Sequence, residues 1–342
     1  MKYVKLGKSK LNVSRVGFGG IPIMRVSFEQ AEKCILTALD LGINYIDTAT
    51  GYGDSEEKIG KVIKKINRDE LIIATKSPPS DAKKLEESIN LSLKRLQIET
   101  IDLYQFHCIN NEEVLKKSLD LVPVLEKARE QGKIRHIGAT VHGVDFINKA
   151  LDVDTFETVM IALNFIVAEA AEVALPNARK KDVGVIAMKP MAGGHIEDAN
   201  LAFKYFLPLE DVVPLVGIQS PEEIEQIVRI LDENIPATEE ELSQMEAIRL
   251  EQGNRFCRRC EYCMPCEHGV QIFPMTIFKS FGKRFPPKEL VKGNWPGMFD
   301  SLEKCVQCGA CEKKCPYNLE IQEILKENAA YFRELQRQFC DE

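Results

Sequence analysis

Short apolar runs alternate with longer amphipathic stretches along residues 13–237, and this alternation constrains the fold more than any other feature of the sequence. The runs are rich in β-branched residues and are continuous rather than alternating in pattern, as is typical of parallel strands buried on both faces. Eight such runs lie at residues 13–20, 43–47, 71–76, 101–107, 134–140, 157–163, 184–189 and 212–217. Between them lie helical patterns such as residues 27–42, where Ser27 and Gln30 fit a capping box and Gly42 fits a C-terminal cap.

The number of alternating elements predicts the fold class, an α/β protein built on a closed (β/α)8 TIM barrel. Eight strands and eight helices, the last helix at residues 221–234, match such a barrel in count and length. An open doubly wound sheet is the alternative, but it usually has fewer strands. Residues 3–12 predict a hairpin ahead of the barrel, and residues 238–253 predict one further helix behind it. We therefore assign residues 1–253 to the barrel and residues 254–342 to a second domain.

The second domain is characterised by its cysteines, since nine of the eleven in the chain lie in its last 86 residues. One motif reads Cys305-x2-Cys308-x2-Cys311-x3-Cys315-Pro316, which has the spacing and trailing proline of a bacterial ferredoxin half-motif. Such closely spaced cysteines wrap the chain around a cuboidal cluster, and in two-cluster proteins the fourth cysteine binds the other cluster. The sequence therefore predicts a small ferredoxin-like iron–sulfur domain, made mostly of helix and loop.

A second motif precedes it and reads Cys257-x2-Cys260-x2-Cys263-x2-Cys266, one residue shorter before its last cysteine and with no proline after it. Eight cysteines in two sets of four predict two [4Fe–4S] clusters with crosswise ligation. Zinc is the alternative metal, although zinc sites generally pair two CxxC units across a loop. The short motif leaves two more alternatives open, either a single cluster or His268 in place of Cys266.

Charge and hydropathy argue against several classes of partner. The formal net charge of −7 argues against nucleic acid, whose binding needs a concentrated basic face. No apolar run approaches the ~20 residues that span a bilayer, and the N-terminus lacks the apolar segment of a secretory signal. We therefore expect a cytoplasmic protein with no nucleic-acid or membrane partner. In a reducing compartment, cluster ligation explains the cysteines better than disulfide bonds do.

Four polar residues fall at, or just beyond, the C-terminal ends of three neighbouring predicted strands: Asp47, Tyr52, Lys76 and His107. In a barrel this end of the strands is the catalytic face. A buried Lys paired with Asp would hold positive charge beside the Tyr phenol, lower its pKa and make it a usable proton donor. The neighbouring His could then hydrogen-bond and orient a carbonyl oxygen. Each residue alone is weak evidence, but together they predict a catalytic site.

The runs that contain these residues resemble the aldo-keto reductases: residues 45–63, 72–76 and 92–107. The resemblance extends over residues 1–237, and with the cysteine tail the chain resembles the subgroup that carries a C-terminal ferredoxin-type domain. It implies an NAD(P)-dependent oxidoreductase that transfers hydride between the nicotinamide and a small-molecule carbonyl, an aldehyde or ketone, or catalyses the reverse oxidation of an alcohol. In that family the four residues form the catalytic tetrad, with the residue at Tyr52 as the proton donor.

The resemblance also implies cofactor contacts at later strand ends and in the loop before residues 221–234: Thr140, Asn164, Lys189, Gly217, Gln219, Ser220 and Glu223. Some depart from the family pattern, since Lys189 stands where an aromatic residue is common and Glu223 where the family has a basic residue for the 2′-phosphate. A carboxylate repels a phosphate but can hydrogen-bond a ribose hydroxyl, so NADH is favoured over NADPH. The alternative is that Glu223 is a solvated charge in the first turn of a helix.

Two other functions stay open at this point. One is an electron-transfer protein that exchanges electrons with a redox partner such as ferredoxin, and the other is a redox-responsive regulator with little turnover. Hydride transfer moves two electrons at once whereas a [4Fe–4S] cluster passes one, so we expect the clusters not to be obligatory in the hydride step. The tail shows little apolar core of its own, so loss of the clusters is expected to unfold it.

Overall fold

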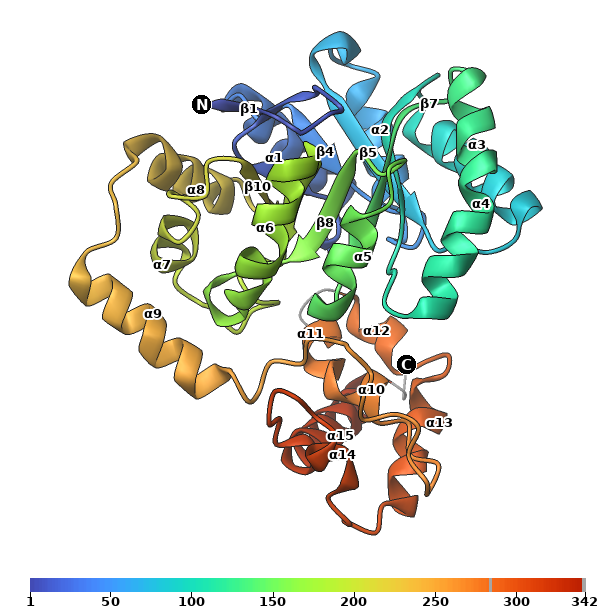
Figure 1. The fold of residues 1–342 in the computed structure, drawn as a ribbon, viewed down its shortest axis with the longest axis vertical. Helices are drawn as coiled ribbons and strands as arrows, with labels where there is room; N and C mark the ends of the chain where they lie inside the picture. Colours follow the sequence, from blue (N-terminus) through green and yellow to red (C-terminus); the bar gives the residue numbers. More distant parts are fainter. Residues whose placement is uncertain (283–284, 340–342) are drawn as a thin grey trace.

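The computed structural model describes residues 1–282 and 285–339, and its central feature is a closed barrel of eight parallel strands (Figure 1). The strands are β3 (Gly17–Gly19), β4 (Tyr45–Asp47), β5 (Ile72–Ser77), β6 (Ile101–Phe106), β7 (Ile134–Val141), β8 (Thr158–Ala162), β9 (Gly184–Met188) and β10 (Val212–Gly217). The barrel closes where β10 pairs with β3, in the register Leu215 with Gly17. The predicted TIM barrel is therefore confirmed, and the open sheet is excluded.

Eight helices pack around the barrel in alternation with the strands. They are α1 (Phe28–Asp40), α2 (Ser55–Ile63), α3 (Ala82–Leu96), α4 (Glu112–Glu130), α5 (Ile147–Leu151), α6 (Glu169–Lys181), α7 (Ala199–Lys204) and α8 (Pro221–Glu233). The predicted start of α1 is present, because the Ser27 hydroxyl accepts a hydrogen bond from the Gln30 N–H at 3.2 Å. The chain leaves this helix through Gly42, whose φ of +85° is one that glycine adopts without strain.

The first predicted strand, residues 13–20, is two elements rather than one. Its first part belongs to β2 (Asn12–Ser14), which pairs with β1 (Tyr3–Lys5) in an antiparallel hairpin, and only Gly17–Gly19 joins the barrel. The chain turns between them at Arg15, whose guanidinium donates to the carbonyl of Phe206 at 2.9 Å. The hairpin packs Leu6 and Val13 into the core inside the barrel and so closes its N-terminal end.

Beyond the barrel, α9 (Glu239–Gln252) leads into a tail with a hydrophobic core of its own. The tail contains α10 (Ile272–Thr276), α11 (Phe278–Gly282), α12 (Pro287–Leu290), α13 (Trp295–Asp300), α14 (Ala310–Lys313) and α15 (Ile321–Phe339). The ring of Phe278 lies 4.9 Å from those of Trp295 and Phe299, and Phe299 stacks on Phe332 of α15 at 4.3 Å. The expectation of a tail with little apolar core is therefore wrong, because aromatic residues on its short helices converge on one amphipathic helix.

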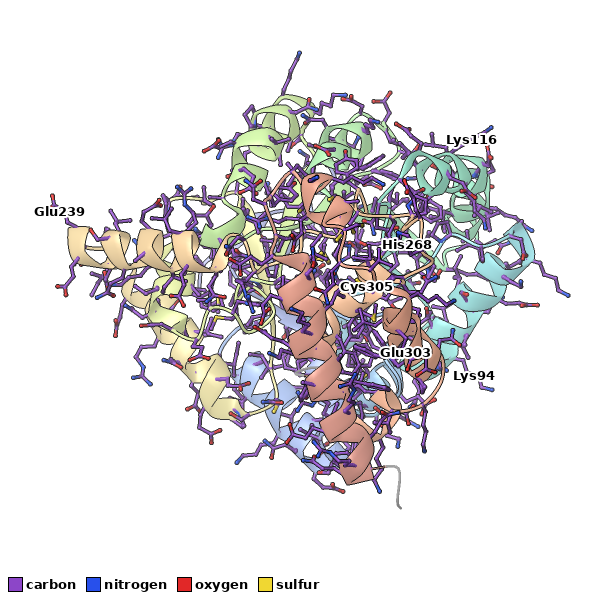
Figure 2. The ribbon with its side chains drawn as sticks, turned by 90° about the horizontal axis from the view of Figure 1, so that it is seen from below. Lys94, Lys116, Glu239, His268, Glu303 and Cys305 are labelled. Carbon is purple, nitrogen blue, oxygen red and sulfur yellow. The ribbon has the colours of Figure 1, made fainter. Side chains whose placement is uncertain are left out.

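The tail lies beneath the C-terminal ends of the barrel strands, and the view from below shows α15 crossing this end of the molecule (Figures 1 and 2). Tyr262 hydrogen-bonds Asp145, and Arg258 reaches the carbonyl of Ile166 at 3.4 Å. Phe256 packs into the barrel core, so the first residues of the tail lie on the barrel. We propose the domain boundary at residues 253 and 254, after α9. Within the described residues, no helix combines the length and the apolar composition needed to cross a membrane.

Candidate active site and cluster ligands

A cavity of about 440 Å³ opens at the C-terminal ends of the strands, and all four predicted catalytic residues line it. Asp47 is the last residue of β4, and Lys76 lies near the end of the neighbouring strand β5. His107 directly follows β6, and Tyr52 lies in the loop between β4 and α2. Three adjacent parallel strands therefore bring residues that are far apart in sequence to one edge of the barrel.

Asp47 and Lys76 form a buried ion pair, with side chains 2% and 3% exposed respectively. The Lys76 ammonium also donates to the carbonyl of Thr48 at 2.7 Å, and the second Asp47 oxygen accepts from the Gln105 amide at 2.9 Å. Burial alone would lower the pKa of Lys76, but the charges of Asp47 and Tyr52 more than offset that effect and raise it. Lys76 thus stays charged inside the cavity, with Asp47 as its counter-ion.

Tyr52 and His107 lie next to each other in the cavity, close to this ion pair. The Lys76 nitrogen lies 5.1 Å from the centre of the Tyr52 ring, and the Tyr52 and His107 rings meet edge to face at 5.9 Å. Burial, followed by the charges of Lys76, Arg259 and Lys189, lowers the pKa of His107 to about 3. The imidazole is therefore neutral at physiological pH, where it can donate one hydrogen bond and accept another.

The predicted cofactor residues divide into two groups. Five of them line the same cavity: Thr140, Lys189, Gly217, Gln219 and Glu223. Asn164 and Ser220 are not among its lining residues, because each belongs to the start of a helical turn. The Asn164 oxygen accepts from the N–H groups of Ile166 and Val167 at 2.9 and 3.1 Å, while its amide donates to the carbonyl of Lys189 at 3.0 Å.

Glu223 also has a structural partner, since its carboxylate caps the first turn of α8. It accepts from the N–H groups of Gln219 at 2.9 Å and Ser220 at 3.3 Å. The sequence left open, as an alternative, that Glu223 is a solvated charge in the first turn of a helix. The structure shows it in that first turn, where its carboxylate is also hydrogen-bonded. The carboxylate still faces the cavity, so its effect on cofactor choice stays a prediction.

Among the described residues, three that line the cavity come from the tail, and sequence reasoning missed all of them. They are Arg259, which lies between two predicted cluster ligands, and Phe281 and Phe285. The sequence contained one relevant signal, since the first cysteine motif fixes the backbone on both sides of Arg259. That signal becomes informative only once the motif is known to lie against the barrel mouth.

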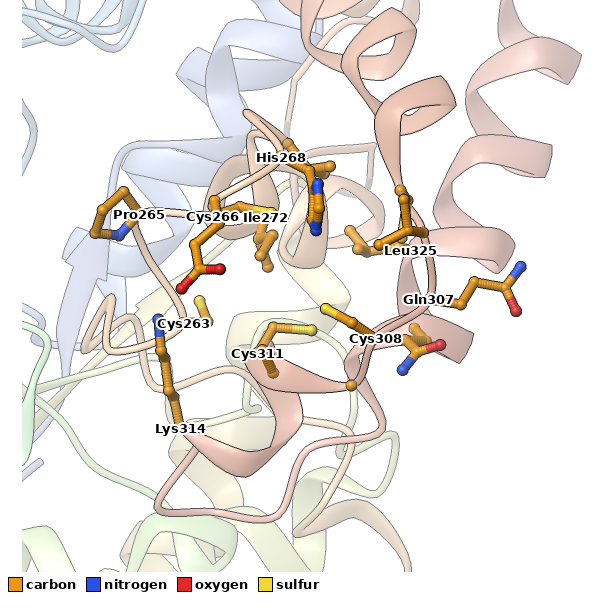
Figure 3. Close-up of a pocket in the computed structure, with 17 residues that line it drawn as sticks. Cys263, Pro265, Cys266, His268, Ile272, Gln307, Cys308, Cys311, Lys314 and Leu325 are labelled. Carbon is orange, nitrogen blue, oxygen red and sulfur yellow. The ribbon is translucent and has the colours of Figure 1, made fainter.

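The eight predicted cluster cysteines gather in two places. The first gathering consists of Cys266, Cys305, Cys308 and Cys311, which line a small cavity of about 40 Å³. Cys263 of the second gathering also lines this cavity, and Figure 3 shows the sulfur atoms of Cys263, Cys308 and Cys311 turned toward the space between them. The three early cysteines of the second motif thus meet Cys266, the last cysteine of the first motif. His268 lines the same cavity, so its role as an alternative ligand stays open.

The second gathering consists of Cys257, Cys260, Cys263 and Cys315. Burial, together with the neighbouring thiols of the other three, raises the pKa of Cys263 to about 12. The pKa of Cys260 is raised by burial and by Cys257 and Cys315. The last cysteine of each motif therefore lies near early cysteines of the other, and crosswise ligation of two clusters stays a prediction. Within the described residues, no three potential ligands converge on a single ion, whereas a cuboidal cluster needs thiols spread around a larger space.

Comparisons with known proteins match both parts of the chain. Residues 15–202 match the Aldo/keto reductase family, and residues 300–319 match the 4Fe-4S binding domain. The L-galactose dehydrogenase of Arabidopsis thaliana is 28% identical over 71% of this chain and 92% of that protein. The NADH-specific methylglyoxal reductase of Escherichia coli is 28% identical over 57% of this chain and 68% of that protein. The holo form of an aldo-keto reductase from Bacillus halodurans superposes with a TM-score of 0.63 at 25% identity, covering 72% of this chain and 96% of that one.

Proposed function

Since the chain belongs to the aldo/keto reductase family and carries a 4Fe-4S binding domain, we propose that it reduces the carbonyl group of a small aldehyde or ketone with NAD(P)H, or catalyses the reverse oxidation of an alcohol. The observation that carries this proposal is the Asp47–Lys76 ion pair beside Tyr52 and His107 in one cavity. A cytoplasmic location and a ferredoxin partner stay predictions.

The roles of the four residues follow from their chemistry and placement. The bound nicotinamide supplies the hydride. Tyr52 gives its hydroxyl proton to the carbonyl oxygen, and the nearby Lys76 ammonium stabilises the phenolate that remains. Asp47 keeps Lys76 charged and in place. His107 is neutral, so it orients the carbonyl oxygen through a hydrogen bond without competing for the proton.

We propose that a nicotinamide cofactor binds on the β3 and β10 side of the cavity, where Gly19 and Gly217 line the rim. A Cβ at Gly217 would lie only 2.7 Å from the Pro22 ring, so packing within the rim requires this glycine. Thr140, Lys189, Gly217 at the end of β10, and Gln219 and Ser220 in the β10–α8 loop are the residues that we propose to hold the cofactor, with NADH favoured because of Glu223.

Replacing Tyr52 tests the proposed reaction most simply. Tyr52→Phe removes the proton donor and keeps the ring, so we expect carbonyl reduction to fall by ~10²-fold or more. Cofactor binding should change little, because the dinucleotide contacts proposed above do not include this hydroxyl. The measurements are steady-state turnover of small aldehydes and titration with NADH. Tyr3→Phe removes the same atom from the hairpin at the opposite end of the barrel, and it should leave turnover intact. Near wild-type turnover in Tyr52→Phe would refute the assignment.

Two [4Fe–4S] clusters are proposed at the two gatherings of four cysteines described above, on the strength of the thiolate donor set. We propose that they fold the tail against the barrel rather than carry electrons in the hydride step, because neither nicotinamide nor a simple carbonyl readily accepts single electrons. Electron transfer with ferredoxin remains the second candidate. One observation favours it, since the loop that holds Cys257 and Cys260 also lines the catalytic cavity through Arg259.

A further inference from the structure

The catalytic cavity contains more positive charge than the proposed reaction uses. His107 and Cys108 both lie within electrostatic reach of Lys76, Lys189 and Arg259. Lys76 pairs with Asp47, and Lys189 is proposed to hold the cofactor. Arg259 lines both the catalytic cavity and a neighbouring cavity of about 270 Å³. Reduction of a neutral aldehyde needs the four catalytic residues and the cofactor, and it gives no role to Arg259.

Arg259 differs from the other arginines of its segment in what its guanidinium contacts. Arg255 pairs with Glu320 and Glu327, and Arg258 donates to backbone carbonyls, including that of Phe256 at 3.0 Å. Arg259 instead lies 5.7 Å over the ring of Phe281.

The groups that face the Arg259 guanidinium in the described part of the chain are Cys108, Cys257 and Tyr52, and none of them is a carboxylate. A half-buried guanidinium that lines a cavity and faces no carboxylate among the described residues is suited to bind an anion from outside the protein.

The placement of Arg259 indicates which anion it would bind. Tyr52 is the proposed proton donor, so a cation that faces Tyr52 lies at the substrate end of the cavity. The proposed cofactor contacts lie on other elements, including the β10–α8 loop. Phe281 and Phe285 line the cavity together with Arg259, and they offer an apolar surface for the body of the same ligand.

We infer that Arg259, supplied by the iron–sulfur domain, binds a carboxylate on the substrate and that the physiological substrates are carboxylate-bearing aldehydes or ketones. The inference rests on the proposed carbonyl reduction and specifies its substrate class. Because Arg259 lies between Cys257 and Cys260, assembly of the cluster at this motif fixes its backbone on both sides. The cluster domain thereby completes the substrate site without carrying electrons.

A matched pair of substrates tests the inference in the full-length, anaerobically purified protein. The acid is 4-carboxybenzaldehyde, and methyl 4-formylbenzoate presents the same reacting group without the charge. We expect NADH-dependent kcat/KM to favour the acid by about 10- to 100-fold, the range for a charge-assisted hydrogen bond. Arg259→Gln should reduce that ratio to near one, and Arg259→Lys should retain part of it. Lys292→Gln removes one charge from an exposed position in the same domain, and it should keep the wild-type ratio.

Separate readouts distinguish failure of the inference from failure of the proposed function. Iron and sulfide, expected at about eight of each per chain for two clusters, show whether the cluster survives in each variant. Calorimetric titration with the two aldehydes measures binding without turnover. A wild-type protein that reduces neither aldehyde contradicts the proposed function, and binding that prefers the acid through Arg259 would still support the inference. Equal kcat/KM for acid and ester in the wild type, or an unchanged ratio in iron-replete Arg259→Gln, overturns the inference.

Discussion

Individual ionisable groups at the barrel mouth have pKa values set by burial and by the cations around them. His107 shows this most clearly, because burial and the charges of Lys76, Arg259 and Lys189 lower its pKa from 6.5 to about 3. A neutral imidazole suits a residue that orients an oxygen, since a charged one would compete with Tyr52 as the proton donor. The same low pKa has a consequence for the pH dependence of the reaction.

The pH–rate profile should show no step from His107 near its ordinary pKa. The folded protein protonates this ring only as the pH falls toward 3, so kcat/KM should not decline between about pH 8 and pH 5 because of this group. The measurement is kcat/KM across that range for the wild type and for His107→Gln. An acid limb near pH 6.5 that disappears in His107→Gln would show that the ring titrates normally.

The unfolded chain protonates this ring near pH 6.5, so the contribution of His107 to folding stability should decrease as the pH falls from 6.5 toward 3.

The four tetrad residues could be predicted from sequence because each follows, or ends, a strongly apolar run, and a barrel places such positions on one face. The contacts that these residues make could not be predicted from sequence. The bond from Gln105 to Asp47 joins residues 58 positions apart, and nothing in the local pattern of β6 marks that glutamine. Arg259 was missed for the same reason, since Tyr52 and Cys108, two of the groups that it faces, lie on the barrel.

At the scale of elements, the start of α8 has two roles, because Glu223 both lines the proposed cofactor site and caps the helix. Glu223 holds the N–H groups of Gln219 and Ser220, so replacing it changes both the charge and the start of the helix. Glu223→Gln keeps an oxygen acceptor for the cap and removes only the charge. We expect it to raise the kcat/KM ratio of NADPH to NADH several-fold, because the repulsion of a 2′-phosphate is lost.

The same measurement on Glu222→Gln gives the control, since Glu222 lies in the same first turn and is not among the residues that line the cavity. Glu223→Arg should shift the preference further toward NADPH, but it should also cost about 1 kcal/mol of unfolding free energy through loss of the cap. A native protein that strongly prefers NADPH, or a Glu223→Gln variant with an unchanged ratio, would contradict the proposed role of this carboxylate.

The barrel strands were predictable because burial on both faces makes most of them continuous apolar runs, as in β9, which reads GVIAM. Residues 13–20 were predicted as one strand because they show that pattern, but they belong to two sheets. Val13 pairs with a strand of the hairpin and Phe18 with a strand of the barrel, with the turn at Arg15 between them. Periodicity cannot separate two very short strands that follow one another so closely.

At the scale of the whole molecule, the tail does more than bind clusters. Its aromatic residues, including Phe278 and Phe299, have no regular spacing, and their common partner Phe332 lies on α15 far along the chain. Sequence patterns therefore missed the core that holds the tail together. They also could not show that the tail covers the barrel mouth, which is what brings Arg259 and Phe281 to the catalytic cavity. On this account the clusters fix a surface of the active site, and the electrons travel as hydride.

Isotope transfer tests that central claim most directly. The anaerobic holoprotein would be given NADH carrying deuterium at both positions of the nicotinamide C4, with 4-carboxybenzaldehyde as the substrate. Mass spectrometry of the alcohol product should show one deuterium in each molecule, because the hydride passes directly from nicotinamide to the carbonyl carbon. Alcohol that contains no deuterium, formed equally well when reduced ferredoxin replaces NADH, would show that the clusters deliver the electrons and would contradict the account.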